Sequence, residues 1–303
     1  MPDHFSAHVS PPPASSSPSP NEPLVIPITA ADGARFELLC VQPVGEWRQL
    51  LYWLPAMGVP ARHYLPMAEA LASRGIAMVV HEWRGIGSSD RRASRRSNWG
   101  YRELLLDDLP PAMSALQKRW PDKVRLIGGH SLGGQVASLY AALHPNDYAG
   151  IALVASGAPY WRAYPRSLLI KIGCMLAPMA ANLRGYLPGR RIGFAGNEAR
   201  GLTSDWARSA RSGRYSATGM SQNLDELLAA LQLPIFALRL RDDWLAPKAS
   251  LEWLLGKMPQ SPNVVGVLAP NDLDGHPANH FSWMKAPAPI VERLADWTDS
   301  LSV

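Results

Sequence analysis

The chain has 303 residues, with 30 Lys or Arg against 25 Asp or Glu and a formal net charge of +5. Its 47% hydrophobic and 18% charged residues are typical of a globular protein, and a chain of this length can bury a large core. Cys40 and Cys174 lie far apart in sequence without metal-ligand spacing, which argues against a disulfide scaffold or a zinc site.

The chain begins with a segment rich in proline and serine, S-P-P-P-A-S-S-S-P-S-P at residues 10–20. No apolar region typical of a signal peptide precedes it. Such a segment cannot bury enough apolar surface to offset its ordering entropy, so we expect residues 1–22 to be disordered. The most apolar later segment, at 167–183, is too short and too interrupted to span a bilayer. We therefore expect a cytoplasmic protein without stable membrane insertion.

Apolar runs alternate with helical patterns along most of the chain, which predicts βα units and a mostly parallel, doubly wound sheet in an α/β fold. In the first part of the core, residues 23–157, the predicted strands lie at 35–41 and 49–54, as the first pair of the sheet, and at 76–80, 123–128 and 151–155. The predicted helices of that part lie at 62–74, 101–120 and 134–143. In the second part, residues 220–303, we predict strands at 234–240 and 263–268 and helices at 248–257 and 288–301.

The alternation stops between residues 158 and 219, where no clear strand is found. An irregular insertion between two strands of a doubly wound sheet lies above the edge that carries the chemistry, so we predict a helical lid or cap. A helical decoration that touches no substrate is the alternative. The segment holds ten Arg or Lys and two acidic residues. Because it carries no nucleic-acid-binding motif, we expect solvated arginines and no nucleic-acid partner, with attraction to an anionic substrate or membrane surface as the minor alternative.

The most informative motif is G-H-S-L-G at residues 129–133, which follows a predicted strand and precedes a predicted helix. A G-x-S-x-G turn in this context is the pattern of a nucleophile elbow. The turn forces its central serine, Ser131, into a strained backbone conformation, so the positions two before and two after it must be small. It also points the helix N-terminus at the reaction centre. We therefore predict that Ser131 is a nucleophile, rather than an idle serine in a glycine-rich turn.

A serine hydroxyl needs a base to take its proton and a carboxylate to orient that base, and in this kind of fold the acid precedes the histidine in the chain. His280 is the favoured base, because it lies just before an aromatic-rich segment and the final helix. The alternative is His276, whose neighbouring proline suggests a tight turn. Asp243, at the end of the strand predicted at 234–240, is the favoured acid, and Asp242 is the fallback.

A tetrahedral oxyanion requires two backbone N–H donors. Leu132, the first residue after the nucleophile, is expected to supply one. The other is expected from the loop after the strand at 49–54, where Val59 is the favoured donor and Met57 the alternative. Gly58 would allow the close backbone approach that this role requires.

With elbow, acid, histidine and oxyanion loop in this order, residues 35–301 resemble the α/β-hydrolase superfamily. The segment E-W-R-G-I-G-S at 82–88 is similar to the D-Y-R-G-x-G-x-S loop that follows the fourth strand in that superfamily, with Glu82 replacing the usual Asp. Segments at 185–193 and 204–206 are similar to a bacterial group of hydrolases related to serine aminopeptidase-like and lysophospholipase-like members. The resemblance implies a serine hydrolase and does not name its substrate.

The combined pattern predicts a serine hydrolase without cofactor or metal, which cleaves a carboxylic ester, thioester or amide through Ser131, His280 and Asp243. An acyl-enzyme intermediate is expected. The alternatives are a non-catalytic ligand-binding protein with the same fold, and a C–C hydrolase or acyltransferase with the same triad.

The substrate partner is expected to be a small acyl or aromatic molecule, because the predicted lid is mainly apolar. Met57, Leu168 and Met175 are the side chains expected to contact it. The sequence does not predict the oligomeric state.

Overall fold

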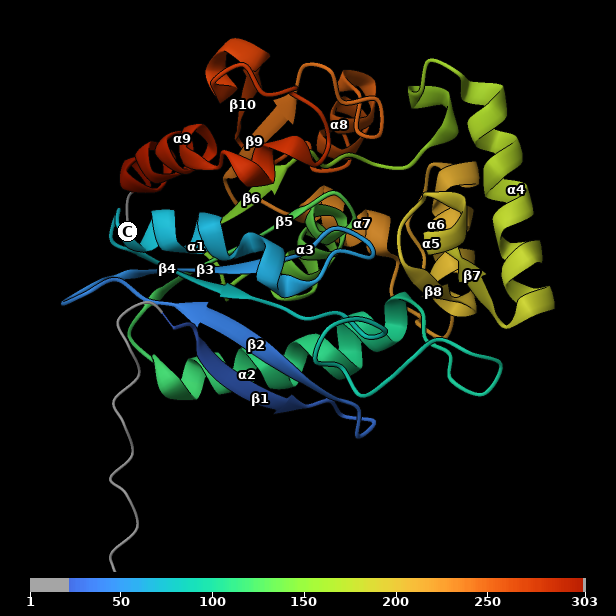
Figure 1. Cartoon of the computed structure of the whole chain (residues 1–303), viewed down its shortest axis with the longest axis horizontal. Coiled ribbons are helices and arrows are strands. Elements are labelled where there is room, and N and C mark those ends of the chain that lie inside the picture. Colours follow the sequence, from blue (N-terminus) through green and yellow to red (C-terminus); the bar gives the residue numbers. More distant parts are fainter. Residues whose placement is uncertain (1–21, 302–303) are drawn as a thin grey trace, which may run out of the picture.

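The structure is a computed structural model that describes residues 22–301 (Figure 1). The tail predicted at 1–22 lies outside the described residues, except for residue 22. The main element is an eight-stranded sheet with the strand order β1-β2-β4-β3-β5-β6-β9-β10. Its strands are β1 Leu24–Thr29, β2 Arg35–Val41, β3 Gln49–Leu54, β4 Ile76–Val80, β5 Val124–His130, β6 Gly150–Val154, β9 Ile235–Leu240 and β10 Asn263–Leu268.

The sheet is parallel from β4 to β10, whereas β1 and β2 run antiparallel at one edge. The prediction that residues 35–41 and 49–54 form a pair is wrong, because β4 lies between β2 and β3. The sequence analysis also missed β1. This edge strand contains Pro27, a residue that a strand tolerates at an edge because its missing N–H is not needed there.

Side chains of successive residues point to opposite faces of the sheet, and each face is covered by helices. In β3, Leu50 and Tyr52 belong to the core on one face, whereas Leu51 and Trp53 belong to the core on the other. Helices α1 and α9 pack on the second face, and α2 and α3 on the first (Figure 1). The core helices are α1 Leu65–Ala72, α2 Leu109–Arg119, α3 Leu132–Leu143, α7 Leu224–Ala230, α8 Lys248–Leu255 and α9 Ala288–Ser300.

The helix predicted at 101–120 is confirmed over residues 101–119. Its middle is a π-helical stretch, Glu103–Asp108, which continues without a break into α2. The Leu109 N–H donates to the Leu104 carbonyl, one residue farther back along the chain than in an α-helix. Pro110 and Pro111 follow directly, and each lacks the N–H that an α-helical hydrogen bond would need.

Residues 158–219, called the insert below, form a separate layer beside the sheet (Figure 1). The insert contains two short strands that pair antiparallel, so the prediction of no strand here is wrong. Each is three residues long, too short for a periodic signal. The longest helix of the insert packs against α6 through Cys174, Ala207 and Ala210. The elements are α4 Ser167–Arg184, β7 Tyr186–Pro188, α5 Gly189–Ile192, β8 Asn197–Ala199 and α6 Arg200–Ser212.

Across residues 22–301, no helix is both long and apolar enough to cross a membrane.

The insert meets the core at the loop after β3. A Cβ atom on Gly58 would lie 2.1 Å from the backbone N of Gly196, which precedes β8. Gly58 also has φ +77°, a conformation that residues with a Cβ rarely adopt. Both conditions require glycine, so this contact is part of how the insert is seated on the core.

Replacing Gly58 by alanine should therefore lower the free energy of unfolding more than the same change at Gly33. Both glycines have positive φ values, 77° and 81°, so each variant loses about 1 kcal/mol to backbone strain. Only at Gly58 does the new Cβ also collide with backbone, since nothing lies within 4 Å of a Cβ at Gly33. Urea denaturation of the two variants measures the difference, and equal losses would contradict the tight contact between insert and core.

Candidate active site

Ser131 lies in the tight turn between β5 and α3, with φ 56° and ψ −119°. This backbone conformation is strained for a residue with a Cβ. A Cβ on Gly129 would lie 2.3 Å from the carbonyl carbon of Gly133, and a Cβ on Gly133 would lie 1.9 Å from the carbonyl oxygen of Leu54. The two glycines of the motif are therefore required by direct contact. The second contact also places the end of β3 against the turn.

His280 and Asp243 form a buried pair, in which His280 Nδ1 lies 2.7 Å from Asp243 Oδ2. The other carboxylate oxygen of Asp243 accepts hydrogen bonds from the N–H groups of Leu245 and Ala246, at 2.9 and 3.0 Å. The side chain of Asp243 is completely shielded from solvent. With three donors directed at it, this carboxylate is fixed in place and fixes the orientation of the His280 ring.

The His280 ring lies against the turn that carries Ser131. Its centroid is 4.7 Å from that of His130, the residue directly before Ser131. The Trp283 Nε1–H donates to the backbone carbonyl of His280 at 3.0 Å and holds the loop in this position. The structure thus brings the His280–Asp243 pair next to the turn that carries Ser131, although the three residues come from distant parts of the chain.

The alternative residues lie elsewhere. Asp242 is exposed and pairs with Arg241 at 3.2 Å, and His276 is exposed in the loop after β10. Within the described residues, no hydrogen bond joins Asp242 to His276, and none joins either of them to His280. Within residues 22–301, no group of three His, Cys, Asp or Glu residues is placed to hold a metal ion.

The expected oxyanion donors need one correction. The Val59 N–H donates to the Ala56 carbonyl at 3.1 Å and closes a tight turn, so it is not free to bind an oxyanion. By contrast, the backbone N–H groups of Met57 and Leu132 make no hydrogen bond within residues 22–301. Both residues also line the same cavity. Met57, the alternative in the sequence analysis, is therefore placed better than Val59.

A buried hydrogen-bonded chain, which the sequence analysis missed, links the elbow to the loop after β3. The Ala56 N–H donates to Tyr64 Oη at 2.9 Å, and the same oxygen lies 2.9 Å from His130 Nδ1. Burial lowers the pKa of His130 well below its ordinary value, so its ring is neutral at pH 7. In the sequence, the only sign of this chain was the polar residue His130 between Gly129 and Ser131 of the motif.

The loop after β4 supports the same region. Glu82 is buried and accepts a hydrogen bond from the Ala61 N–H at 3.0 Å, and the Trp83 Nε1–H donates to the Pro55 carbonyl at 2.8 Å. A Cβ on Gly87 would lie 1.7 Å from a Glu82 carboxylate oxygen. This loop therefore fixes both ends of the segment that contains Met57, and the longer Glu82 side chain fills the space that Gly87 leaves.

An inner hollow adjoins the elbow through Leu132, an outer hollow shares Ile86 with it, and neither is lined by Leu168 or Met175. The inner one has a volume of about 10 Å³, room for about one water molecule. The side chains of Leu168 and Met175 are 64% and 52% exposed on α4, so their predicted contact with substrate is not supported. The inner hollow is lined by Met57, Gly58, Trp83, Arg84, Ile86, Trp99, Leu104, Leu132, Glu198 and Leu202.

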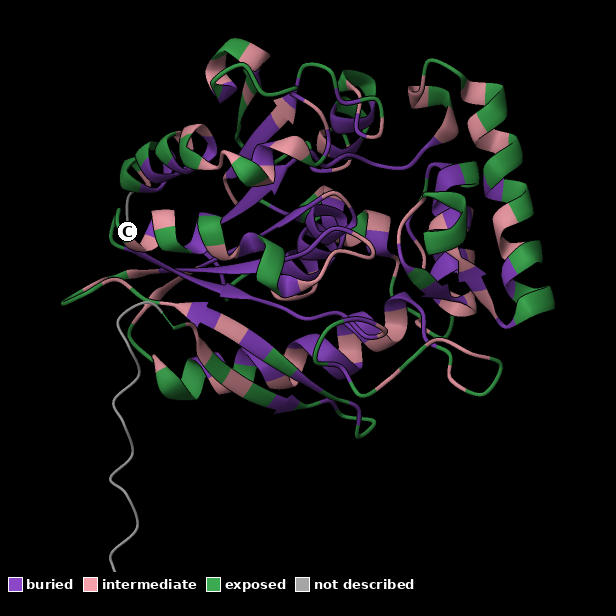
Figure 2. Ribbon diagram, in the orientation of Figure 1, coloured by how far each residue is buried: buried purple, intermediate pink, exposed green. Residues whose placement is uncertain are grey.

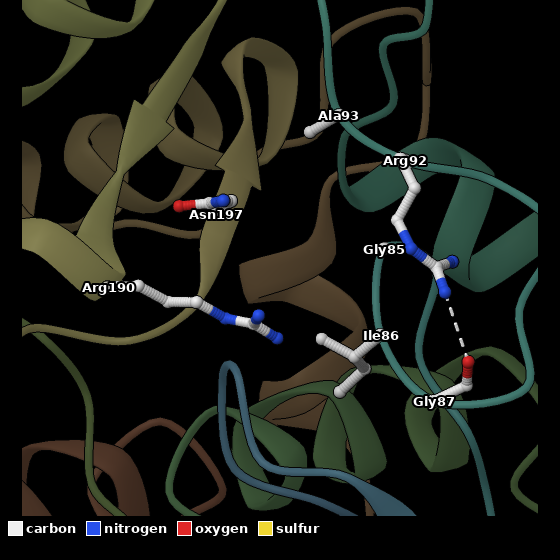
Figure 3. A pocket seen from close by; sticks show the side chains of 7 residues that line it. All are labelled: Gly85, Ile86, Gly87, Arg92, Ala93, Arg190 and Asn197. Carbon is white, nitrogen blue, oxygen red and sulfur yellow. Dashed lines mark hydrogen bonds between the residues drawn. The ribbon is translucent and has the colours of Figure 1, made fainter.

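The outer hollow, of about 200 Å³, lies at the seam between the insert and the loop after β4 (Figure 3). Ile86 lines both hollows, which places them next to each other. Arg190 of α5 reaches across the outer hollow toward Ile86, and Arg92 donates to the Gly87 carbonyl at 3.1 Å (Figure 3). The outer hollow thus has two arginine side chains in its wall.

Glu198 on β8 is a buried carboxyl group in the wall of the inner hollow. Burial raises its pKa from 4.5 to about 7, although a hydrogen bond from the Gly196 N–H and the nearby charge of Arg190 lower it in part. The Gly196 N–H lies 2.9 Å from the Glu198 Oε1 atom. The carboxyl group therefore gains or loses its proton near neutral pH while it faces the cavity.

The fold is that of an α/β hydrolase. An esterase from Thermogutta terrifontis superposes with a TM-score of 0.61 at 19% identity, over 92% of this chain and 100% of the esterase. An esterase from Exiguobacterium antarcticum superposes with a TM-score of 0.62 at 15% identity, over 91% and 100% of the two chains. At these identities the similarity establishes the fold alone.

Residues 45–264 match the family described as serine aminopeptidase, S33, and the chain belongs to this family. Human monoglyceride lipase is 26% identical over 125 residues, which are 41% of this chain and 40% of the lipase. The mouse monoglyceride lipase is 26% identical over 164 residues, 54% of this chain and 50% of that protein. The chain thus spans about half the length of the curated relatives that it matches.

The raised pKa of Glu198 predicts a loss of stability as the pH rises. Between about pH 4.5 and 7 the folded state holds a proton on Glu198 that the unfolded state releases, so the free energy of unfolding falls across this range by about 3 kcal/mol. The neutral variant Glu198→Gln can keep the hydrogen bond to Gly196 and should lack this loss. Urea denaturation should therefore give the variant a larger free energy of unfolding than the native chain at pH 8, and no larger one at pH 5. Glu69→Gln, on the exposed face of α1, is the control and should follow the native chain. If the free energy of unfolding of Glu198→Gln changed with pH as that of the native chain does, the raised pKa would not belong to Glu198.

Proposed function

We propose that this protein is a serine hydrolase that cleaves a carboxylic ester of a small-molecule substrate through an acyl-enzyme intermediate. The observation that carries the proposal is the buried His280–Asp243 pair, at 2.7 Å, beside a serine held at φ 56° in a nucleophile elbow. Membership of the S33 family and the similarity to monoglyceride lipases support ester hydrolysis.

In the proposed mechanism, the Ser131 hydroxyl attacks the ester carbonyl carbon while His280 Nε2 takes its proton. Asp243, hydrogen-bonded to Nδ1, keeps the imidazole in the tautomer with a free Nε2 and stabilises the imidazolium that forms. The negative charge that develops on the carbonyl oxygen is stabilised by the N–H groups of Leu132 and Met57, of which the first is at the N-terminus of α3.

The tetrahedral intermediate collapses when the imidazolium gives its proton to the alcohol oxygen, which leaves. A water molecule then repeats the sequence against the acyl-enzyme: His280 takes a proton from water, the hydroxide oxygen attacks the acyl carbon, and Ser131 leaves with the proton returned by His280. The products are the acid and the regenerated serine.

The insert acts in this proposal as a lid over the site. The inner hollow holds only about one water molecule, so an acyl group can enter only if the insert and the core move apart. The apolar walls of that hollow, Trp83, Trp99, Leu104 and Leu202, provide the surface for the acyl group. The Gly58–Gly196 contact lies where the two parts would separate.

A fluorophosphonate probe should label the native chain and fail to label the Ser131→Ala variant. The probe reacts only with a serine that an adjacent base activates, so labelling reports on the assembled site. Mass spectrometry of the labelled peptide identifies the modified residue. Labelling that survives in the variant would disprove the assignment of Ser131.

The two neighbouring aspartates provide a matched pair. Asp243→Asn should lower kcat by about 10³- to 10⁴-fold, because an asparagine can donate to Nδ1 and hold the wrong imidazole tautomer. Asp242→Asn should leave kcat within about twofold, because the exposed Asp242 side chain pairs with Arg241, and the Asp242 backbone bond to Ala278 is kept in the variant. Hydrolysis of p-nitrophenyl butyrate by both variants measures the effect, and equal losses would argue against the acid role of Asp243.

A further inference from the structure

Helix α4 presents an apolar face to solvent. Seven large apolar side chains of this one helix are between 44% and 77% exposed. Figure 2 shows α4 as the outermost helix of the insert, with mainly exposed residues along its length. We call this surface the α4 face; its residues are Leu168, Leu169, Ile172, Met175, Leu176, Met179 and Leu183.

The α4 face is continuous. At 100° per residue, the seven side chains fall within an arc of about 120°, and the helix of 18 residues is about 27 Å long. Cys174 and Ala181, which are buried, point to the opposite side of the same helix. The helix is thus attached by small residues and leaves its large apolar residues uncovered, a concentration that marks a contact surface.

Basic residues border the α4 face. On the helical projection, Lys171 lies at one edge of the arc, and Arg166 and Arg184 lie toward the other. The only acidic residues of the insert, Glu198 and Asp205, are 5% and 0% exposed. All the charged side chains that the insert exposes are therefore basic.

We propose that the α4 face docks on an anionic lipid bilayer, with α4 lying in the plane of the interface. An amphipathic helix with large apolar residues on one side and Lys or Arg at the borders buries its apolar side at the level of the headgroups. Each basic residue near an anionic surface strengthens this attachment. A second copy fits less well, because pairing two α4 faces would bring two basic surfaces together.

The proposal predicts binding to vesicles that depends on α4 and on lipid charge. The native chain should float with vesicles of phosphatidylcholine and phosphatidylglycerol, and more weakly with phosphatidylcholine alone. Met175→Gln/Met179→Gln should weaken binding by at least about tenfold, because it removes apolar surface from the centre of the face. Lys171→Gln should weaken binding to the charged vesicles by about fivefold.

Matched control variants show whether vesicle binding depends on the α4 face itself or on any exposed apolar or basic side chain. Val44→Gln/Val264→Gln removes two apolar side chains that are 96% and 57% exposed elsewhere, and Lys118→Gln removes an exposed charge on α2; both should bind like the native chain. Circular dichroism and fluorophosphonate labelling of each protein show whether it is folded, independently of binding.

Three results would overturn the proposal. The first is a native chain that floats with no vesicle, and the second is a double methionine variant that binds like the native chain. The third is a native dimer by light scattering that the double variant converts to a monomer without any vesicle binding, which would assign the α4 face to a second copy. Binding to vesicles does not depend on Ser131, so failure of the proposed hydrolysis leaves this test intact.

Discussion

The site depends on one backbone constraint, the positive φ of Ser131. The turn holds this conformation only because Gly129 and Gly133 pack against each other and Gly133 packs on the carbonyl of Leu54. The same contacts bring the end of β3 next to the start of α3. A single strained residue therefore aligns two loops, so that Met57 and Leu132, whose N–H groups make no hydrogen bond within residues 22–301, line one cavity.

The surrounding structure opposes relaxation of that strain through buried polar contacts rather than through packing alone. Tyr64 joins the backbone of Ala56 to His130, the neighbour of Ser131. Glu82 holds the beginning of the following helical turn at Ala61. Each of these groups is buried, so a broken contact would leave an unsatisfied polar group out of reach of water, at a cost of about 1–3 kcal/mol. These buried contacts therefore hold the loop in its observed geometry.

Most of the sheet could be predicted from the sequence because its strands are buried on both faces. Continuous apolar runs such as Ile76–Val80 have few alternative interpretations, whereas β1 alternates, lies at an edge and contains Pro27. The pairing of β2 with β4 could not be predicted, because it brings together segments separated by β3 and α1 and leaves no local pattern.

Positions relative to the predicted strand and the final helix ranked Asp243 over Asp242 and His280 over His276, and the structure pairs the favoured residues. They were not sufficient for the second oxyanion donor. Val59 and Met57 are two residues apart in one loop, and only the hydrogen bond from the Val59 N–H to Ala56 separates a free donor from an occupied one. Such a difference lies in the backbone conformation, which residue types do not specify.

The apolar residues of α4 illustrate a different limit of sequence patterns. A helical apolar stripe indicates that one side of a helix is covered, but the stripe does not name what covers it. The apolar character of the segment suggested that Leu168 and Met175 contact the substrate, yet the helix packs through the small residues Cys174 and Ala181 instead. Small residues permit close approach to α6, so the large ones are turned outward. The surface proposed for the acyl group, formed mainly by core residues, and the exposed apolar surface of α4 are thus separate, and basic residues of the insert border the second.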